Sequence, residues 1–278
     1  MTKETGMKLA VIAASLVRQM RHLRFDAPVA CVYNPWEYAM GPYRRYVERF
    51  GRRRREVILL GMNPGPWGMA QTGIPFGEVN AAKSWLEVEA PVGRPRRVHP
   101  RRPVEGFACG RSEVSGARLW GWARETFQTP RRFFERFFVV NYCPLCFMED
   151  SGRNRTPDKL PAHEREPLFR ACDRALRQTV EFLSPRVVVG VGKFAETRAK
   201  LALEGFDVLV GRILHPSPAS PAANRDWASQ ANRQLEALGI ALPLRPAGTV
   251  VKEVQPPVAK QPVRRRRRGQ AMTEVPHG

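Results

Sequence analysis

The chain has 278 residues, of which 43% are hydrophobic, and its 46 basic against 26 acidic residues leave a formal net charge of +20. This length allows one substantial core and excludes a miniprotein held together by disulfides. The positive charge favours a polyanionic partner, of which nucleic acid is the commonest, although a proteome rich in arginine would give the same excess. Five widely spread cysteines favour a reducing compartment, and no signal peptide or membrane span is visible. We therefore expect an intracellular protein without a membrane partner, cytoplasmic in a bacterium or nuclear in a eukaryote.

Apolar residues at helical spacing predict an amphipathic helix over residues 7–24. They are Leu9, Ile12, Leu16, Val17 and Met20. Short apolar runs typical of buried strands follow at Val29–Tyr33, Val57–Leu60, Phe137–Val140, Val187–Val191 and Val208–Leu214. Between them, helices are predicted at Ser115–Phe127, Pro161–Leu183, Lys193–Glu204 and Pro221–Leu238. This alternation predicts an α/β fold with a parallel sheet and helices on both faces, in which ligands bind at the carboxyl ends of the strands.

Two segments are predicted to lack regular structure. Residues 91–103 are rich in proline and arginine, which is typical of a basic surface loop. From Pro246 the chain is rich in proline and contains the run Arg264–Arg268, so we expect a disordered tail. Its seven basic and two acidic residues supply only +5 of the net charge, and the remaining +15 belongs to the body of the protein.

The first candidate functional residues follow the strand at Val57–Leu60. Three glycines and two prolines within Gly61–Gly68 shape a tight turn that a ligand can approach closely. Asn63 sits at its tip, where an amide is no strong base but can hold a water molecule. Phe76, in the turn GIPFGE, should be presented rather than buried, as a ring on which a planar base stacks. The alternative is a loop without chemistry; the Gly-Lys-Ser/Thr ending of a phosphate-binding loop is absent.

A second candidate, Asn141, ends the apolar run at Phe137–Val140. One carboxamide can satisfy both the N3 donor and the O4 acceptor of uracil, whereas cytosine presents a mismatched edge. A structural cap at the end of the strand is the alternative. The nearby pair Cys143 and Cys146 forms a lone CxxC, and a zinc or iron–sulfur site needs about four ligands, so no metal is expected.

The third candidate is His215, which ends an apolar run and opens the loop HPSPASPAANRDW. A histidine at a strand end is more often structural, but this one should share a sheet edge with Asn63 and Asn141. A neutral imidazole there could donate to the oxygen on which charge develops as a uracil anion departs. The stiff loop after it has the composition of a wedge that presses into the minor groove of a duplex.

These motifs resemble those of the single-strand-selective monofunctional uracil-DNA glycosylases, a branch of the uracil-DNA glycosylase superfamily. GMNPGPWGMAQTGIPFGE is similar to the family's first long motif and HPSPASPAANRDW to its second. The segments SEVSGARLWGW, NYCPL, SGRNRTP and VVVGVGKFAE resemble the family in order and spacing between them. The likeness runs from about Pro28 to Leu244 and does not include the tail.

The resemblance implies a three-layer α/β/α sandwich around a short, mainly parallel sheet. It implies that Asn63 positions the hydrolytic water and that His215 stabilises uracil O2 as the base leaves. Asn141 would read the Watson–Crick edge, Phe76 would stack on the base, and Met62 and Gly65 would line the pocket. The wedge would comprise Pro216, Ser217, Pro218, Ala219, Ser220, Pro221, Asn224 and Arg225. Because the family usually has arginine where this chain has Ala219, the resemblance implies a weaker plug, for which Ser220, Asn224 or Arg225 would have to compensate.

We expect residues 1–25 to form a helix packed on the body, 26–245 a catalytic domain and 246–278 the tail. The predicted reaction is hydrolysis of the N-glycosidic bond of uracil, and of 5-substituted uracils such as 5-hydroxymethyluracil, in single- and double-stranded DNA. We expect a monomer that initiates base-excision repair without a cofactor. Since none of the three motifs contains lysine, no lyase step is expected. The alternatives are an iron–sulfur-type uracil-DNA glycosylase and a non-catalytic single-strand DNA-binding protein.

Overall fold

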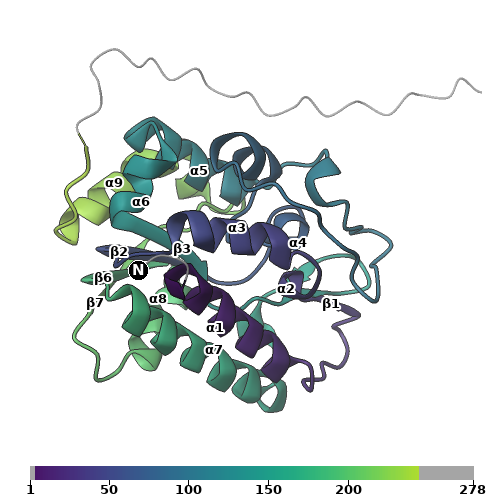
Figure 1. Ribbon diagram of the computed structural model, residues 1–278. Helices are drawn as coiled ribbons and strands as arrows, with labels where there is room; N and C mark the ends of the chain where they lie inside the picture. Colours follow the sequence, from purple (N-terminus) through teal and green to yellow (C-terminus); the bar gives the residue numbers. More distant parts are fainter. Residues whose placement is uncertain (1–3, 244–278) are drawn as a thin grey trace, which may run out of the picture. The chain divides into compact units, whose positions relative to one another are not determined.

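A four-stranded parallel sheet forms the centre of the computed structural model, which describes residues 4–243 (Figure 1). Its strand order is β3-β2-β6-β7. The strands are β2 (Val57–Gly61), β3 (Phe137–Asn141), β6 (Val187–Val191) and β7 (Leu209–Ile213). Strands β2 and β6 are buried along their whole length, as expected for continuous apolar runs covered on both faces. The strand predictions in this part of the chain are confirmed.

Helices cover both faces of this sheet (Figure 1). On one side lie α1 (Glu4–Met20), α7 (Ala162–Leu183) and α8 (Lys193–Ala202), and on the other α5 (Val114–Phe127), α6 (Pro130–Arg136) and α9 (Pro221–Ala237). The remaining helical elements are α2 (Pro35–Tyr38), α3 (Met40–Phe50), α4 (Met69–Thr72), a π-helical turn at Ala81–Trp85, and 3-10 turns at Gly106–Ala108 and Pro157–Lys159. The chain therefore has the predicted α/β architecture, with a parallel sheet between helices.

Helix α1 contacts α3 and α7. The five apolar residues predicted to form its buried face are all at most 9% exposed: Leu9, Ile12, Leu16, Val17 and Met20. None of the helices among residues 4–243 is both long and apolar enough to cross a membrane. The tail predicted from residue 246 lies outside the described residues.

The first predicted strand is not part of the parallel sheet. β1 (Cys31–Tyr33) pairs antiparallel with β4 (Cys146–Met148), which pairs antiparallel with β5 (Asn154–Arg155). Only residues 142–145 separate β3 from β4, and so short a link cannot form the crossover that a parallel neighbour needs. This small sheet holds the basic loop, because the Tyr33 hydroxyl donates to the carbonyl of Arg102 at 2.7 Å and accepts from the amide of His99 at 2.8 Å.

The register of the parallel strands places three chain segments at one edge. Gly61 at the end of β2 is directly opposite Asn141 at the end of β3, and β7 ends at Ile213, two residues before His215. Since the carboxyl ends of parallel strands share an edge, the turns that follow β2, β3 and β7 meet there.

Candidate active site

A cleft of about 490 Å³ opens at this edge of the sheet. Most of the predicted site residues line it: Met62, Asn63, Gly65, Phe76, Asn141, His215, Ser217 and Pro218. The remaining lining residues are Pro66, Glu113, Ser115, Asn154 and Thr156. The structure thus gathers the residues of all three predicted clusters around one space, whereas their individual roles stay predictions.

Asn141 places an unsatisfied acceptor in the cleft wall. Its Nδ2 donates to the sulfur of Met69 at 3.2 Å, which leaves its second N–H free. Its Oδ1 is buried and has no hydrogen-bond partner. A buried carbonyl oxygen without a partner costs free energy, on the order of 1–3 kcal/mol, unless a ligand supplies a donor. The amide therefore presents an acceptor and a donor side by side, as the N3–H and O4 of uracil require.

Phe76 packs beside this amide, and its placement depends on two glycines. A Cβ on Gly61 would lie 2.5 Å from the ring, at Cε2, and a Cβ on Gly116 would lie 2.2 Å from the Phe76 carbonyl. Phe76 has a positive φ of 53°, which is costly for an aromatic residue, and the indole of Trp120 holds its carbonyl at 3.0 Å. The ring is only 7% exposed, so the expectation that it would be presented rather than buried is wrong. It lies within the protein and contributes to the wall of the cleft.

Asn63 is anchored through one half of its amide. Its Nδ2 donates to the carbonyl of Leu145 at 3.1 Å, and Leu145 belongs to the NYCPLC turn after β3. The Asn63 side chain lines the cleft, and its anchored Nδ2 leaves the oxygen as the available atom. An amide fixed in this way can accept a hydrogen bond from a water molecule and orient it, without the basicity to remove a proton.

His215 enters the cleft from the turn after β7. Burial lowers the pKa of this imidazole to about 4, so it is neutral at physiological pH. The turn is fixed at Leu214, whose carbonyl accepts from Trp227 at 2.6 Å and whose amide donates to Gln234 at 2.7 Å. The imidazole lies 6.3 Å from the Phe76 ring, measured between centroids. A neutral imidazole can donate to a developing oxyanion without first carrying a charge of its own.

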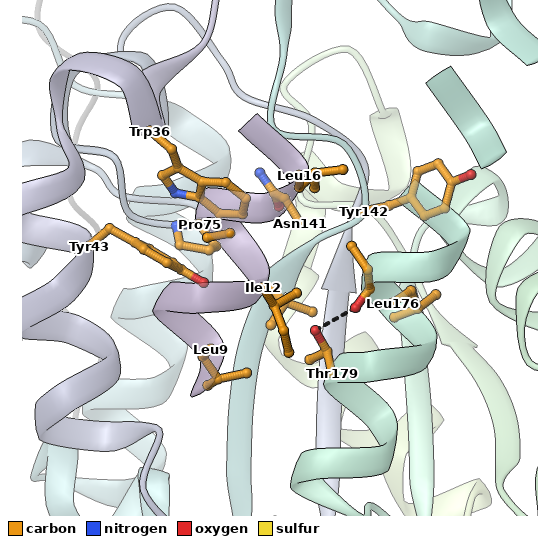
Figure 2. A pocket seen from close by; sticks show the side chains of 13 residues that line it. Leu9, Ile12, Leu16, Trp36, Tyr43, Pro75, Asn141, Tyr142, Leu176 and Thr179 are labelled. Atoms are coloured by element: carbon orange, nitrogen blue, oxygen red, sulfur yellow. Dashed lines mark hydrogen bonds between the residues drawn. The ribbon is translucent and has the colours of Figure 1, made fainter. Parts of the chain in front are cut away.

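A second cavity lies behind Asn141 and is too small for a base. Its volume is about 30 Å³, enough for a single water molecule. Figure 2 shows Trp36, Tyr43 and Pro75 on one side of it and Leu176 and Thr179 on the other, around side chains of α1. Of the two spaces that Asn141 borders, only the larger cleft can therefore admit a pyrimidine.

Comparisons with known proteins place the chain in a family. The model of the uracil DNA glycosylase superfamily matches residues 48–236. Over 228 residues the chain is 51% identical to a single-strand selective monofunctional uracil DNA glycosylase of Mus musculus, covering 81% of each chain. The corresponding enzyme of Rattus norvegicus is 50% identical over 234 residues, covering 84% of each. The chain belongs to the single-strand selective monofunctional uracil-DNA glycosylase family. The fold agrees with the crystal structure of Pedobacter heparinus SMUG2, with a TM-score of 0.57 at 16% identity, covering 83% of this chain and 99% of that one.

In a member of this glycosylase family, the loop after His215 is the candidate wedge. Only some of its residues are exposed and therefore able to contact DNA. Pro216 is buried, so it cannot press into DNA as predicted. Ser220 caps α9 by accepting from the amide of Ala223, and Asn224 is held by Arg118 at 2.8 Å and by the carbonyl of Pro218 at 2.9 Å. Because both side chains are engaged within the protein, neither is free to replace a missing arginine plug.

The exposed residues of the predicted wedge are Pro218, Ala219, Pro221, Asn224 and Arg225. Arg118 supports the loop from α5, donating to the carbonyls of Pro216 and Ser217 at 3.2 and 3.3 Å. Ser220, Asn224 and Arg225 were the three residues expected to compensate for Ala219. Of these, Arg225 is exposed and its side chain makes no hydrogen bond or ion pair with the described residues. The predicted wedge is thus a braced loop that exposes the small side chain of Ala219.

Sequence reasoning missed five residues of the glycosylase cleft, most notably Glu113, Asn154 and Thr156. All three lie in segments that resemble the family, SEVSGARLWGW and SGRNRTP, but nothing in those segments alone assigned them a place. Asn154 donates to the carbonyl of Pro64 at 3.2 Å and so fixes the turn that carries Asn63. Burial, with a smaller contribution from Glu78, raises the pKa of Glu113 to about 7.

The cysteines of this family member are buried thiols. All five are free, and burial raises the pKa of Cys146 and Cys172 well above the ordinary value. Within residues 4–243, the one group of potential metal ligands close enough to share an ion is Asp26, His163 and Glu164. None of these three lines the cleft, and Glu164 lies in the first turn of α7, where the helix dipole disfavours a cation. Among the described residues, the CxxC pair is not part of a group of three or more ligands close enough to share an ion.

Proposed function

We propose that the chain hydrolyses the N-glycosidic bond of uracil, and of 5-substituted uracils such as 5-hydroxymethyluracil, in DNA. The observation that carries this is the buried, unpartnered Oδ1 of Asn141 in the cleft wall. Uracil offers the N3–H that this oxygen lacks, and its O4 can accept the free N–H of the same amide. Cytosine has an unprotonated N3 and an amino group in place of O4, so both contacts would be mismatched.

The reaction is dissociative. The C1′–N1 bond lengthens first and leaves an oxocarbenium sugar and a uracil anion. Neutral His215 donates to O2 of the departing base, and a single well-placed donor is worth roughly 10²–10³ in rate. Asn63 holds the water that adds to C1′, which suffices because the sugar is already cationic when the water attacks. Leaving-group stabilisation therefore carries much of the acceleration.

The product is an abasic site in an intact strand. A lyase step needs an amine that forms a Schiff base with the sugar, and no lysine lines the cleft in the described part of the chain. The enzyme thus initiates base-excision repair and leaves strand cleavage to another activity. We expect it to act as a monomer inside the cell, where its substrate is.

DNA is the partner in this proposal, and an aromatic and cationic cluster beside the cleft supports it. Trp67 follows the lining residue Pro66, and the guanidinium groups of Arg102 and Arg111 lie 5.2 and 4.4 Å from the centroid of its ring. Such a cluster can stack on an unpaired base and neutralise the neighbouring phosphates. It would thus hold the strand on either side of an extruded nucleotide.

A glycosylase assay on matched oligonucleotides tests the proposal. Single- and double-stranded DNA carrying uracil, 5-hydroxymethyluracil, hypoxanthine or thymine would be incubated with the protein and then treated with alkali to reveal abasic sites. We expect cleavage products from the first two bases and no adduct on borohydride trapping. Absence of turnover on every uracil substrate would refute the proposed function, and a trapped covalent adduct would refute the monofunctional reaction.

The same assay tests the two catalytic roles. Asn63→Ala and His215→Leu should each lose most of the activity and still bind DNA, with His215→Leu at least as impaired as Asn63→Ala. The exposed residues Asn80 and His22 provide matched controls, because Asn80→Ala and His22→Leu make the same chemical changes away from the cleft. Near-normal turnover in either test variant removes that residue from its role.

A further inference from the structure

A cavity of about 390 Å³ lies outside the glycosylase cleft, where the end of α1, strand β1 and the basic loop of residues 91–103 meet. It shares no lining residue with the cleft. Four arginines line it against a single acid, Glu37, and we call it the arginine pocket. The four are Arg21, Arg24, Arg96 and Arg97. Such an excess of positive charge attracts an anion.

Two of the four arginines are already engaged by the protein. Arg21 forms an ion pair with Glu37 at 3.4 Å, and Arg24 donates to two nearby backbone carbonyls at 3.0 and 3.1 Å. Arg96 and Arg97 are exposed, and within residues 4–243 no hydrogen bond or ion pair from either guanidinium group is found. These two groups are therefore available for a phosphate, which the planar guanidinium fork matches in geometry.

Asn34 gives the pocket a polar atom that the protein leaves unsatisfied. The residue lines the pocket and is 9% exposed, and its Oδ1 is buried without a hydrogen-bond partner. It is the N-cap residue of α2, but its side chain makes no capping hydrogen bond. A buried carbonyl oxygen in this state costs free energy unless a ligand supplies a donor. A phosphodiester has no donor, so the ligand must also carry an N–H or O–H group.

Much of the remaining wall of the arginine pocket is apolar. It includes Leu23, Phe25, Val29 and Leu145. A nucleotide combines the properties that such a wall requires, since its phosphate is anionic, its base is flat and largely apolar on its faces, and the edge of the base carries N–H groups. The volume of about 390 Å³ lies within the usual range of sites for small molecules, about 300–1,000 Å³.

The basic loop connects the arginine pocket to the cluster beside the glycosylase cleft. Arg102, whose guanidinium lies over the Trp67 ring, belongs to the same loop as Arg96 and Arg97. The stretch from Arg97 to Arg102 spans at most about 18 Å even if it is fully extended. Roughly five nucleotides of one strand cover that distance at about 3.4 Å each. A strand whose uracil occupies the cleft is therefore long enough to reach the pocket.

We propose that the arginine pocket binds one nucleotide of the substrate strand at a distance from the uracil, with its phosphate on Arg96 and Arg97 and its base at Asn34. This inference rests on the proposed function and adds a second binding site for the same strand. A free mononucleotide presents the same chemistry, and the experiment separates the two sources. Strands that span both sites should bind more tightly than strands that reach only the cleft.

Binding of single strands of different length tests this proposal. Each strand carries one stable analogue of an abasic site, so that no turnover occurs, and a tail of about 4 to 16 nucleotides on its 5′ or its 3′ side. Affinity is measured by fluorescence anisotropy. The test variant is Arg96→Ala/Arg97→Ala. The matched control, Arg53→Ala/Arg94→Ala, removes the same charge from two exposed arginines that do not line the pocket.

In the wild type, affinity should rise at least about tenfold once the tail on one side reaches the pocket, which is the equivalent of one charge-assisted hydrogen bond. The gain should be lost in Arg96→Ala/Arg97→Ala and kept in the control. With the longest strand, the slope of log affinity against log salt should become shallower by about 1.4 in the test variant, because each lost phosphate contact removes about 0.7. The control should keep the wild-type slope.

Asn34→Ala tests the contact to the base separately from the contact to the phosphate. It should reduce the gain from the longer tail several-fold and leave the salt slope unchanged, because no charge is removed. A folded Asn34→Ala protein with the full gain would remove Asn34 from the site. If this variant does not fold, the two exposed arginines still decide.

The negative outcomes are distinguishable. A wild type that excises uracil, with an affinity that does not depend on tail length or a gain that persists in Arg96→Ala/Arg97→Ala, overturns this inference alone. Binding of thymidine monophosphate that depends on the arginine pair, without any gain from the tail, would indicate a site for free nucleotides and also overturn it. A wild type that excises no uracil overturns the proposed function itself.

Discussion

Gly61, the last residue of β2, is the position at which one added methyl group should do most harm to base recognition. A Cβ there would lie 2.3 Å from Asn141 Oδ1 and 2.5 Å from the Phe76 ring. The backbone cannot easily withdraw, since Gly61 is paired with Asn141 in the parallel ladder. Restoring an ordinary contact of 3.4 Å moves the Asn141 oxygen by about 1.1 Å. A misplacement of about 1 Å costs on the order of 100-fold in rate, so we expect Gly61→Ala to lose about that factor on uracil.

The measurement is single-turnover excision from a uracil oligonucleotide. Gly121→Ala on α5 is the matched control, because no atom lies within 4 Å of the added Cβ, and it should keep the rate and gain up to about 1 kcal/mol of stability. Overpacking at Gly61 should cost about 1–3 kcal/mol, so rates are compared well below the Tm of each variant. A folded Gly61→Ala protein with the wild-type rate would refute the placement of the base between Asn141 and Phe76.

Three further predictions concern the same cleft. Asn141→Leu removes both contacts to the base edge and should lower uracil excision by at least about 100-fold, with binding to abasic DNA, followed by fluorescence anisotropy, unchanged. Burial lowers the pKa of His215 to about 4 from its ordinary value of 6.5, so between these values the unfolded chain binds more protons than the folded one. The free energy of unfolding, measured in urea, should therefore fall as the pH drops from 6.5 towards 4, and His215→Leu should abolish this part of the fall; an identical pH dependence in both proteins would contradict it. Trp67→Ala should weaken binding of single-stranded uracil DNA by about 1–3 kcal/mol. Arg111→Ala should lower the salt dependence of binding. If both variants bind this DNA with the affinity and the salt dependence of the wild type, Trp67 and Arg111 do not contact the bound strand.

The central sheet could be predicted because its signal is local. Each of the four parallel strands is a short apolar run that ends in residues typical of turns, and burial on both faces follows directly from that pattern. The meeting of Asn63, Asn141 and His215 followed from the same reasoning, since carboxyl ends of parallel strands share an edge. Helix α3 was not predicted, although its buried residues Tyr43, Tyr46, Val47 and Phe50 stand at helical spacing, because its sequence, MGPYRRYVERF, has a glycine and a proline at its start. Its helical state owes much to packing on α1.

Features that depend on distant contacts could not be predicted. The backbone of Phe76 is held by Trp120 and allowed by Gly116, both on α5, so no property of the turn GIPFGE reveals that the ring is buried. Glu113 precedes a helix and is followed by Val114, a context in which a glutamate is ordinarily a solvated cap. Only the three-dimensional structure shows that Gly65 and Gly68 admit its carboxyl into the cleft.

The polar groups of the cleft share a pattern that restricts what can bind. Asn63 and Asn141 each have the Nδ2 engaged by the protein, on the Leu145 carbonyl and the Met69 sulfur, and each has an oxygen left over. Turning the Asn141 amide to suit cytosine would set its oxygen against the Met69 sulfur and lose the N–H contact, so the sulfur helps to fix the orientation that favours uracil. Glu113, when ionised, is a third acceptor, and neutral His215 supplies a donor. A ligand that satisfies this set must bring a ring N–H, a bound water and an oxygen beside the scissile bond.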